Sequence, residues 1–282
     1  MFYASPSPNV TPSPARQLLE KLLHWLLPAP CLGCSEPLGQ TRNSLGLCRD
    51  CRRRLVRWPQ NSCATCGRLL AAEPPPSWRC SSCRQRPPSY DRILSAWSYQ
   101  PPLDAVVMGL KFRRLDYLGA HLGRVLAEIY RPELGDCELV VPVPLYWTRR
   151  LSRGYNQALT IARPLAAALG IPLAQPLSRR RPTPPQSRLS RAARRRNLQD
   201  AFALKRTAAC RGRHLLLVDD VTTTGATLEA AAACLRRADP KSIVALTAAR
   251  TPEPAQMSEL AARAGLPRQQ TSPQEVFFTA RR

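Results

Sequence analysis

The sequence predicts an α/β fold in which a mostly parallel sheet carries helices on both faces, preceded by a small cysteine-rich module. Two observations carry this prediction. From about residue 90 onward, short apolar runs alternate with longer helical stretches, which is the pattern of a parallel sheet covered by helices. Before that point, eight of the eleven cysteines lie between residues 31 and 83, in a polar stretch with almost no apolar core.

In the α/β part, ligands are expected beyond the carboxyl ends of the strands, as in other parallel sheets. The loops that follow Val143 and Val218 are therefore the first places to look for a site. Strands are predicted at 93–99, 138–143, 214–218 and 242–247, and helices at 103–112, 115–130, 156–169 and 225–238.

Composition points to acidic partners. The chain has 282 residues and a formal net charge of +23, from 42 Lys and Arg against 19 Asp and Glu. Only four of the basic residues are Lys, so arginine, which can grip a phosphate through two parallel hydrogen bonds, dominates. Nucleic acid and phosphorylated small molecules are the partners that such a charge favours. Apolar residues make up 44% of the chain, which excludes wholesale disorder.

Four regions are expected along the chain. They are a disordered start with an amphipathic helix that docks on a domain or contacts a partner (1–28), a double zinc ribbon (29–88), the α/β domain (89–252) and a flexible tail (253–282). No run of 18 apolar residues is present, so we expect no membrane span. The best apolar stretch, 18–27, is interrupted by charged residues and lacks a basic start, so we expect no signal peptide and a cytoplasmic protein.

The cysteines between 31 and 83 form four C-x2-C pairs that repeat with a period of 32 residues. Each pair presents two thiolates to one metal ion, and two pairs complete a tetrahedral Zn²⁺ site. The sequence therefore predicts two structural Zn²⁺ sites, and joining the first two pairs and the last two is simpler than a crossed pairing. The predicted ligands are Cys31, Cys34, Cys48, Cys51, Cys63, Cys66, Cys80 and Cys83.

A disulfide framework is the alternative for these cysteines. It needs an oxidising compartment, and it rarely uses four identical pairs. Arginines surround the pairs, together with Trp58 and Trp78. Such a face either binds single-stranded nucleic acid by charge and stacking, or is simply solvated.

The segment that follows Val218 carries the sharpest chemical signal in the chain. Two adjacent acids precede a turn rich in threonine and glycine that opens a helix. The turn offers backbone N–H groups, hydroxyls and a helix N-terminus to one phosphate, and the carboxylates suit a diol or Mg²⁺. A well-capped helix is the alternative, although capping needs only one such residue. The candidate residues are Val218, Asp219, Asp220, Val221, Thr222, Thr223, Thr224, Gly225, Ala226 and Thr227.

These ten residues resemble the motif with which type I phosphoribosyltransferases bind 5-phosphoribosyl 1-pyrophosphate (PRPP). Other segments resemble the ComF/GntX family, and the cysteine module is similar to the N-terminal double zinc ribbon of that family. The full set in this order is highly specific and covers about residues 25–250. The matching segments are Lys111-Phe112, Pro-Val-Pro at 142–144, Arg-Gly-Tyr-Asn-Gln at 153–157, Thr183 with Gln186, Arg-Asn-Leu at 196–198, and Ala201-Phe202.

The resemblance implies a role for each segment. Asp219 and Asp220 would hold the ribose hydroxyls of PRPP, and residues 222–227 would cradle its 5-phosphate. With Arg153, the two acids are the predicted catalytic residues, because carboxylates suit the positive charge that develops on the sugar and arginine suits the departing pyrophosphate. A loop with Pro144, Arg149, Arg150, Arg153 and Gly154 would face pyrophosphate and Mg²⁺. A basic flexible loop at 178–200, with Thr183, Gln186, Arg196 and Asn197, would close over the site or track a nucleic-acid backbone.

Two functions stay open from the sequence. The first is a phosphoribosyltransferase that uses PRPP and Mg²⁺ on an acceptor that no matched motif identifies. The second is a non-catalytic, zinc-containing protein of the same fold that binds single-stranded DNA. The association of the resembled family with natural competence implies a role in DNA uptake, with single-stranded DNA and the DNA-uptake machinery as partners.

Overall fold

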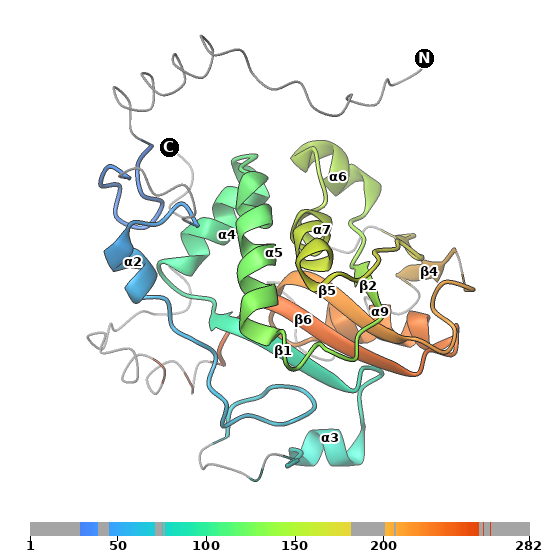
Figure 1. Ribbon diagram of the computed structural model, residues 1–282. Helices are drawn as coiled ribbons and strands as arrows, with labels where there is room; N and C mark the ends of the chain where they lie inside the picture. Colours follow the sequence, from blue (N-terminus) through green and yellow to red (C-terminus); the bar gives the residue numbers. More distant parts are fainter. Residues whose placement is uncertain are drawn as a thin grey trace, which may run out of the picture.

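The computed structural model describes residues 29–38, 45–70, 75, 77–181, 201–205, 207–253, 256 and 260. Within that part of the chain, a four-stranded parallel sheet has the order β1-β6-β5-β2, and the predicted α/β fold is confirmed (Figure 1). The strands of this sheet are β1 (Arg92–Ser98), β2 (Leu139–Pro142), β5 (His214–Thr222) and β6 (Ser242–Arg250).

Helices cover both faces of the sheet, α4, α5 and α7 on one and α9 on the other (Figure 1). Along β5, Leu216 and Val218 join the core beneath the first three helices, whereas Leu215 and Leu217 join the core beneath α9. Because successive side chains of a strand point to opposite faces, a strand buried on both faces is apolar throughout. The helices are α4 (Leu103–Phe112), α5 (Tyr117–Tyr130), α7 (Gln157–Leu169) and α9 (Ala226–Arg236).

The α5 and α7 helices pack at very short range through two glycines of α5. A Cβ atom on Gly119 would lie 2.4 Å from the hydroxyl oxygen of Thr160, and one on Gly123 would lie 2.3 Å from the carbonyl oxygen of Ile161. Any larger residue would push the helices apart. This contact fixes α7, and with it the turn that precedes α7, against the sheet.

Strand β5 is longer than the sequence suggested. The prediction ended it at 218, but it continues through Thr222, so Asp219 and Asp220 belong to the strand itself. The reason is tertiary, because β6 runs alongside and pairs Asp219 with Thr247 and Thr222 with Arg250. A neighbouring strand thus keeps a locally polar segment extended.

The segment predicted as a pyrophosphate loop contains a helix, α6 (Trp147–Arg153), which corrects that prediction. No glycine or proline interrupts 145–153, and Arg and Leu are good helix formers. Gly154 ends the helix in the left-handed conformation, with φ of 82°, as a C-terminal glycine commonly does. Arg149, Arg150 and Arg153 therefore project from a helix rather than from a loop.

A small antiparallel pair, β3 (Leu177–Arg179) and β4 (Phe202–Leu204), flanks the predicted basic loop. The first residues of that loop, Ser178 and Arg179, are therefore in a strand. Residues 182–200, which include Thr183, Gln186, Arg196 and Asn197, lie outside the described residues, as do residues 1–28. Within the predicted C-terminal tail, Leu260 is fully buried and packs against Val56 and Leu69 of the cysteine module.

The cysteine module contains two short helices, α2 (Arg49–Arg53) and α3 (Ser81–Gln85). The segment around Arg57 in this module runs antiparallel to the outer edge of β1, where Arg57 pairs with Trp97. The Trp58 N–H donates to the Ala96 carbonyl over 3.0 Å, and the Ser98 N–H donates to the Val56 carbonyl over 2.8 Å. These bonds cover an otherwise open sheet edge and hold the module against the α/β domain.

Candidate functional site

The acid pair lies at the carboxyl end of β5. Asp220 is buried, and its Oδ2 atom lies 3.2 Å from the Nζ atom of Lys111 at the end of α4. The N–H of Asp220 donates to Oδ1 of Asp219 over 2.9 Å, and the N–H of Val221 donates to Oδ1 of Asp220 over 2.7 Å. Local backbone bonds and one cation thus fix both carboxyl groups at the sheet edge.

The carboxyl group of Asp219 has a strongly shifted pKa. Burial, and then the charge of Asp220, raise the pKa of Asp219 to about 7, although the Asp220 N–H, Lys111 and Arg179 act in the opposite direction. The Asp219 carboxyl therefore holds its proton more tightly than an exposed aspartate does. Acids with strongly shifted pKa values are concentrated at functional sites, where burial and neighbouring charges are arranged to shift them.

A pocket of about 370 Å³ lies between the end of α4 and α6. Arg153 bridges these elements, because its guanidinium lies 5.2 Å from the centre of the Phe112 ring and donates to Oε1 of Gln157 over 3.1 Å. Four of the six lining residues are cationic, so the pocket suits a polyanion such as pyrophosphate. The lining residues are Lys111, Phe112, Arg114, Arg149, Ser152 and Arg153.

Not every predicted pyrophosphate residue reaches this pocket. Arg149 and Arg153 line it, whereas Arg150 is exposed and is absent from the lining. Pro144 and Gly154 flank α6 on its two sides. Asn156 caps α7, since its Oδ1 accepts the Ala158 N–H over 3.1 Å, so its side chain has a structural role.

The turn between β5 and α9, residues 222–226, has the features of a phosphate site, and we call it the phosphate loop. Gly225 has a φ of 78°, which brings the backbone into the first turn of α9. The hydroxyl oxygens of Thr222 and Thr224 are buried without a hydrogen-bond partner among the described residues. Leaving a buried hydroxyl unpaired costs about 1–3 kcal/mol, so a ligand that supplies acceptors would explain both. The residues present therefore fit a bound phosphate.

Sequence reasoning underestimated Lys111 and Arg179. Lys111 entered only through the family resemblance, and its ion pair with Asp220 joins residues 109 positions apart. It is one of only four lysines in an arginine-rich chain, which is the signal that could have found it. Arg179 was counted in the basic loop, but its guanidinium lies over the Phe202 ring, near Asp219 and Arg149.

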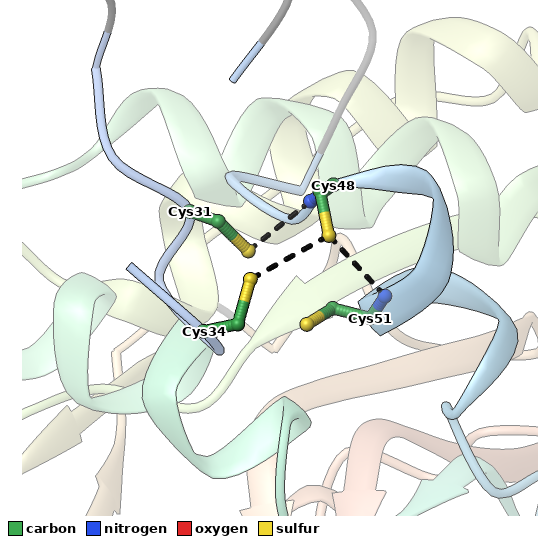
Figure 2. A group of neighbouring side chains, drawn as sticks. All are labelled: Cys31, Cys34, Cys48 and Cys51. Carbon is green, nitrogen blue, oxygen red and sulfur yellow. Dashed lines mark hydrogen bonds between the residues drawn. The ribbon is translucent and has the colours of Figure 1, made fainter. Parts of the chain in front are cut away.

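The first two cysteine pairs come together, and so do the last two, which is the sequential arrangement. In each of the two four-cysteine groups, the four sulfur atoms lie within 4.8 Å of one another (Figure 2 shows the first group). The Sγ atoms of Cys34 and Cys48 are 3.7 Å apart, as are those of Cys66 and Cys80. A tetrahedral Zn²⁺ site with Zn–S bonds of about 2.3 Å has sulfur–sulfur edges of about 3.8 Å, so both groups fit zinc.

Backbone N–H groups favour the thiolate form of Cys31 in the first group, whereas burial raises the pKa of Cys51. Burial alone raises the pKa of Cys31, but hydrogen bonds from the backbone, first that of Cys48, outweigh it and lower the pKa to about 6. The Cys48 N–H donates to the Cys31 sulfur over 3.2 Å, and the Gly33 N–H over 3.4 Å. Metal ligation requires the thiolate form, so this backbone arrangement suits a metal site.

The fold and these sites define a phosphoribosyltransferase-type α/β domain joined to a pair of four-cysteine groups. Residues 156–275 match the phosphoribosyl transferase domain family, and residues 22–85 match the double zinc ribbon domain family. The chain is 38% identical over 217 residues to the DNA utilization protein YhgH of Salmonella typhimurium. The aligned residues cover 75% of this chain and 92% of that protein. The chain belongs to the ComF/GntX family, as the sequence motifs predicted.

Two further relatives extend the comparison. Competence protein F of Haemophilus influenzae is 33% identical over 217 residues, covering 73% of this chain and 90% of that protein. Competence protein ComFC of Bacillus subtilis is 28% identical over 199 residues, covering 67% of this chain and 77% of that protein. In the described part of this chain, none of the helices has the length and apolar character needed to cross a bilayer.

Proposed function

We propose that this chain binds PRPP together with Mg²⁺ at the carboxyl edge of its sheet and acts in phosphoribosyl transfer. One observation carries the proposal: the site presents a phosphate loop, an acid pair and a cationic pocket in succession. The unpaired hydroxyls of Thr222 and Thr224 suit the 5-phosphate, Asp219 and Asp220 suit the ribose diol, and the pocket suits pyrophosphate. PRPP carries those three groups in that order.

The chemistry of transfer agrees with the charges. Positive charge develops on the sugar when pyrophosphate departs, and the carboxylates of Asp219 and Asp220 would stabilise it. Lys111, Arg149 and Arg153 would stabilise the negative charge on the leaving pyrophosphate. Mg²⁺ would neutralise further phosphate charge. Among the described residues, only the cysteines form a group of three or more metal-ligand side chains, so PRPP itself would supply most Mg²⁺ ligands.

We also propose that each four-cysteine group holds one structural Zn²⁺. The support is the sulfur geometry together with the match to the double zinc ribbon family. Such sites supply folding free energy directly, which a segment with few apolar residues needs.

The second candidate is single-stranded DNA binding on the same fold. It is favoured by the net charge of +23 and by relatives whose names refer to DNA utilization and competence. We propose a role linked to DNA uptake in either case. DNA would be held through arginines and the phosphate backbone, so binding would weaken steeply with salt.

A pair of titrations separates the two candidates. PRPP would be titrated calorimetrically with and without Mg²⁺, with ribose 5-phosphate and pyrophosphate as partial ligands. We expect Mg²⁺-dependent PRPP binding that is tighter than that of either fragment. Single-stranded DNA would then be titrated by fluorescence anisotropy, with and without PRPP. DNA binding in the absence of any PRPP binding would support the second candidate and contradict the first.

A further inference from the structure

The second four-cysteine group is attached to strands β6 and β1 of the sheet through the backbone carbonyls of its first turn. Arg250, the last residue of β6, donates from Nη1 to the carbonyl of Cys66 over 2.6 Å. The N–H of Ile93 in β1 donates to the carbonyl of Thr65 over 2.9 Å. These bonds require the turn to keep the shape that four-sulfur coordination gives it.

Burial and a contact with Trp58 fix the Arg250 side chain in turn. It is only 8% exposed, and its guanidinium lies 5.4 Å from the centre of the Trp58 ring. The indole N–H of Trp58 donates in turn to the carbonyl of Gly67 over 3.0 Å. A buried arginine that loses its acceptor is costly, so the Cys66 carbonyl fixes the position of the Arg250 guanidinium.

The backbone of Arg250 supports the phosphate loop directly. Arg250 is the strand partner of Thr222, the first residue of that loop. The N–H of the following residue, Thr251, donates to the Thr222 carbonyl over 2.9 Å. Any shift at the end of β6 therefore moves one of the two unpaired hydroxyls proposed to face phosphate.

A second contact reaches the phosphate loop from the other side. A Cβ atom on Gly225 would lie 3.2 Å from the Tyr90 hydroxyl, and Tyr90 is a buried residue between α3 and β1. Its neighbour Ser89 donates from N–H and Oγ to the carboxylate of Glu229, both over 2.8 Å. Glu229 lies in the first turn of α9, so the segment that leaves the second four-cysteine group also braces this turn.

The first four-cysteine group has no comparable link to the phosphate loop among the described residues. Its Gly33 lies against Pro102 and its Leu32 lies near Gly109, both in or next to α4. Cys31 and Cys51 are part of the core on the α4–α5 face of the sheet. The two groups therefore share ligand spacing but support different parts of the α/β domain.

We propose that Arg250 is a positioning residue that couples the second four-cysteine group to the phosphate loop, so that metal at this group orders the loop and strengthens PRPP binding. The part concerning PRPP rests on the proposed function. Because linkage is reciprocal, bound PRPP would raise the metal affinity of the second group by the same factor.

Two matched pairs of variants test the coupling. Cys66→Ser and Cys34→Ser replace equivalent ligands of the second and first groups, and Arg250→Gln and Arg57→Gln each remove an arginine that stacks on a tryptophan. Hydrogen exchange at 222–226 is the first readout, with 215–218 in β5 as the internal reference for folding. Metal content and PRPP affinity are the second and third.

We expect Cys66→Ser and Arg250→Gln to accelerate exchange at 222–226 and to weaken PRPP binding, each about tenfold. Arg250→Gln keeps both metal ions, and Arg250→Lys restores part of the effect. Cys34→Ser and Arg57→Gln leave exchange at 222–226 unchanged. Unchanged exchange there in Arg250→Gln would overturn the coupling. If exchange responds as expected but wild-type chain binds no PRPP, the coupling stands and the proposed function fails.

Discussion

The second four-cysteine group and the α/β domain reach their order by different means. In the α/β domain, two apolar cores fill the space on either side of the sheet, and the strands are buried on both faces. Around the second four-cysteine group, the buried cluster among the described residues consists of the cysteines and Trp78. Metal coordination thus takes the place of a core in one region, while the other region can tolerate a highly charged site at its edge.

Metal removal should give the largest difference in stability between the two regions. We expect two Zn²⁺ per purified chain, and each thiolate site contributes on the order of 10 kcal/mol of binding free energy that is also folding free energy. Chelation should abolish exchange protection around the second four-cysteine group while the sheet stays protected. Elemental analysis and hydrogen exchange measure both quantities. A metal content near zero, with disulfides found by mass spectrometry, would contradict the zinc sites.

A core truncation tests the other region. Leu216 in the centre of β5 is fully buried between strands and helices. Leu216→Ala should lower the free energy of unfolding of the α/β domain by about 2–5 kcal/mol, because it leaves a cavity. Denaturant titration measures the loss, and zinc content serves as the control. A variant that lost zinc but kept its unfolding midpoint would reverse the contrast between the two regions.

Two arginines of α6 offer a smaller, matched contrast within the site. Arg149 lines the pocket, whereas Arg150 is exposed and does not. Arg149→Gln should weaken PRPP binding by about 10- to 100-fold, the equivalent of one or two charge-assisted hydrogen bonds. Arg150→Gln should change it less than about twofold. Equal losses in both variants would mean that pyrophosphate does not enter this pocket.

The acid pair gives the smallest effect on stability, and it depends on pH. The pKa of Asp219 is raised by burial to about 7 from an ordinary value of 3.8, so the folded chain holds this proton more tightly than the unfolded chain. The contribution of the protonated Asp219 to the free energy of unfolding is therefore fully present below pH 3.8, and it is lost as the pH rises through about 7. Asp219→Asn should therefore raise the free energy of unfolding by roughly 1–3 kcal/mol at pH 8 and by less at pH 5. Thermal unfolding of wild type and variant at both pH values measures this difference. A gain in the free energy of unfolding that is the same at both pH values would contradict the shifted pKa.

Local patterns in the sequence predicted much of this structure. The C-x2-C spacing predicted the two four-cysteine groups, and the alternation of apolar runs predicted a sheet covered on both faces. The extension of β5 to Thr222 was missed because strand β6, remote in sequence, holds it. The Lys111–Asp220 pair and the Arg250–Cys66 bond were missed for the same reason. Spacing specifies ligands that are close in sequence, whereas these contacts exist only after the sheet has assembled.

The central claim is that Asp219 and Asp220 hold PRPP beside the phosphate loop. Calorimetric titration of PRPP with Mg²⁺ into wild type and into the Asp219→Asn/Asp220→Asn double variant tests it most directly. The substitutions keep shape and remove charge, and each lost charge-assisted hydrogen bond costs about 1.5–3 kcal/mol. We predict wild-type binding that weakens by at least tens of fold in the double variant, with an unchanged circular dichroism spectrum. Equal PRPP affinity in the two proteins would contradict the account.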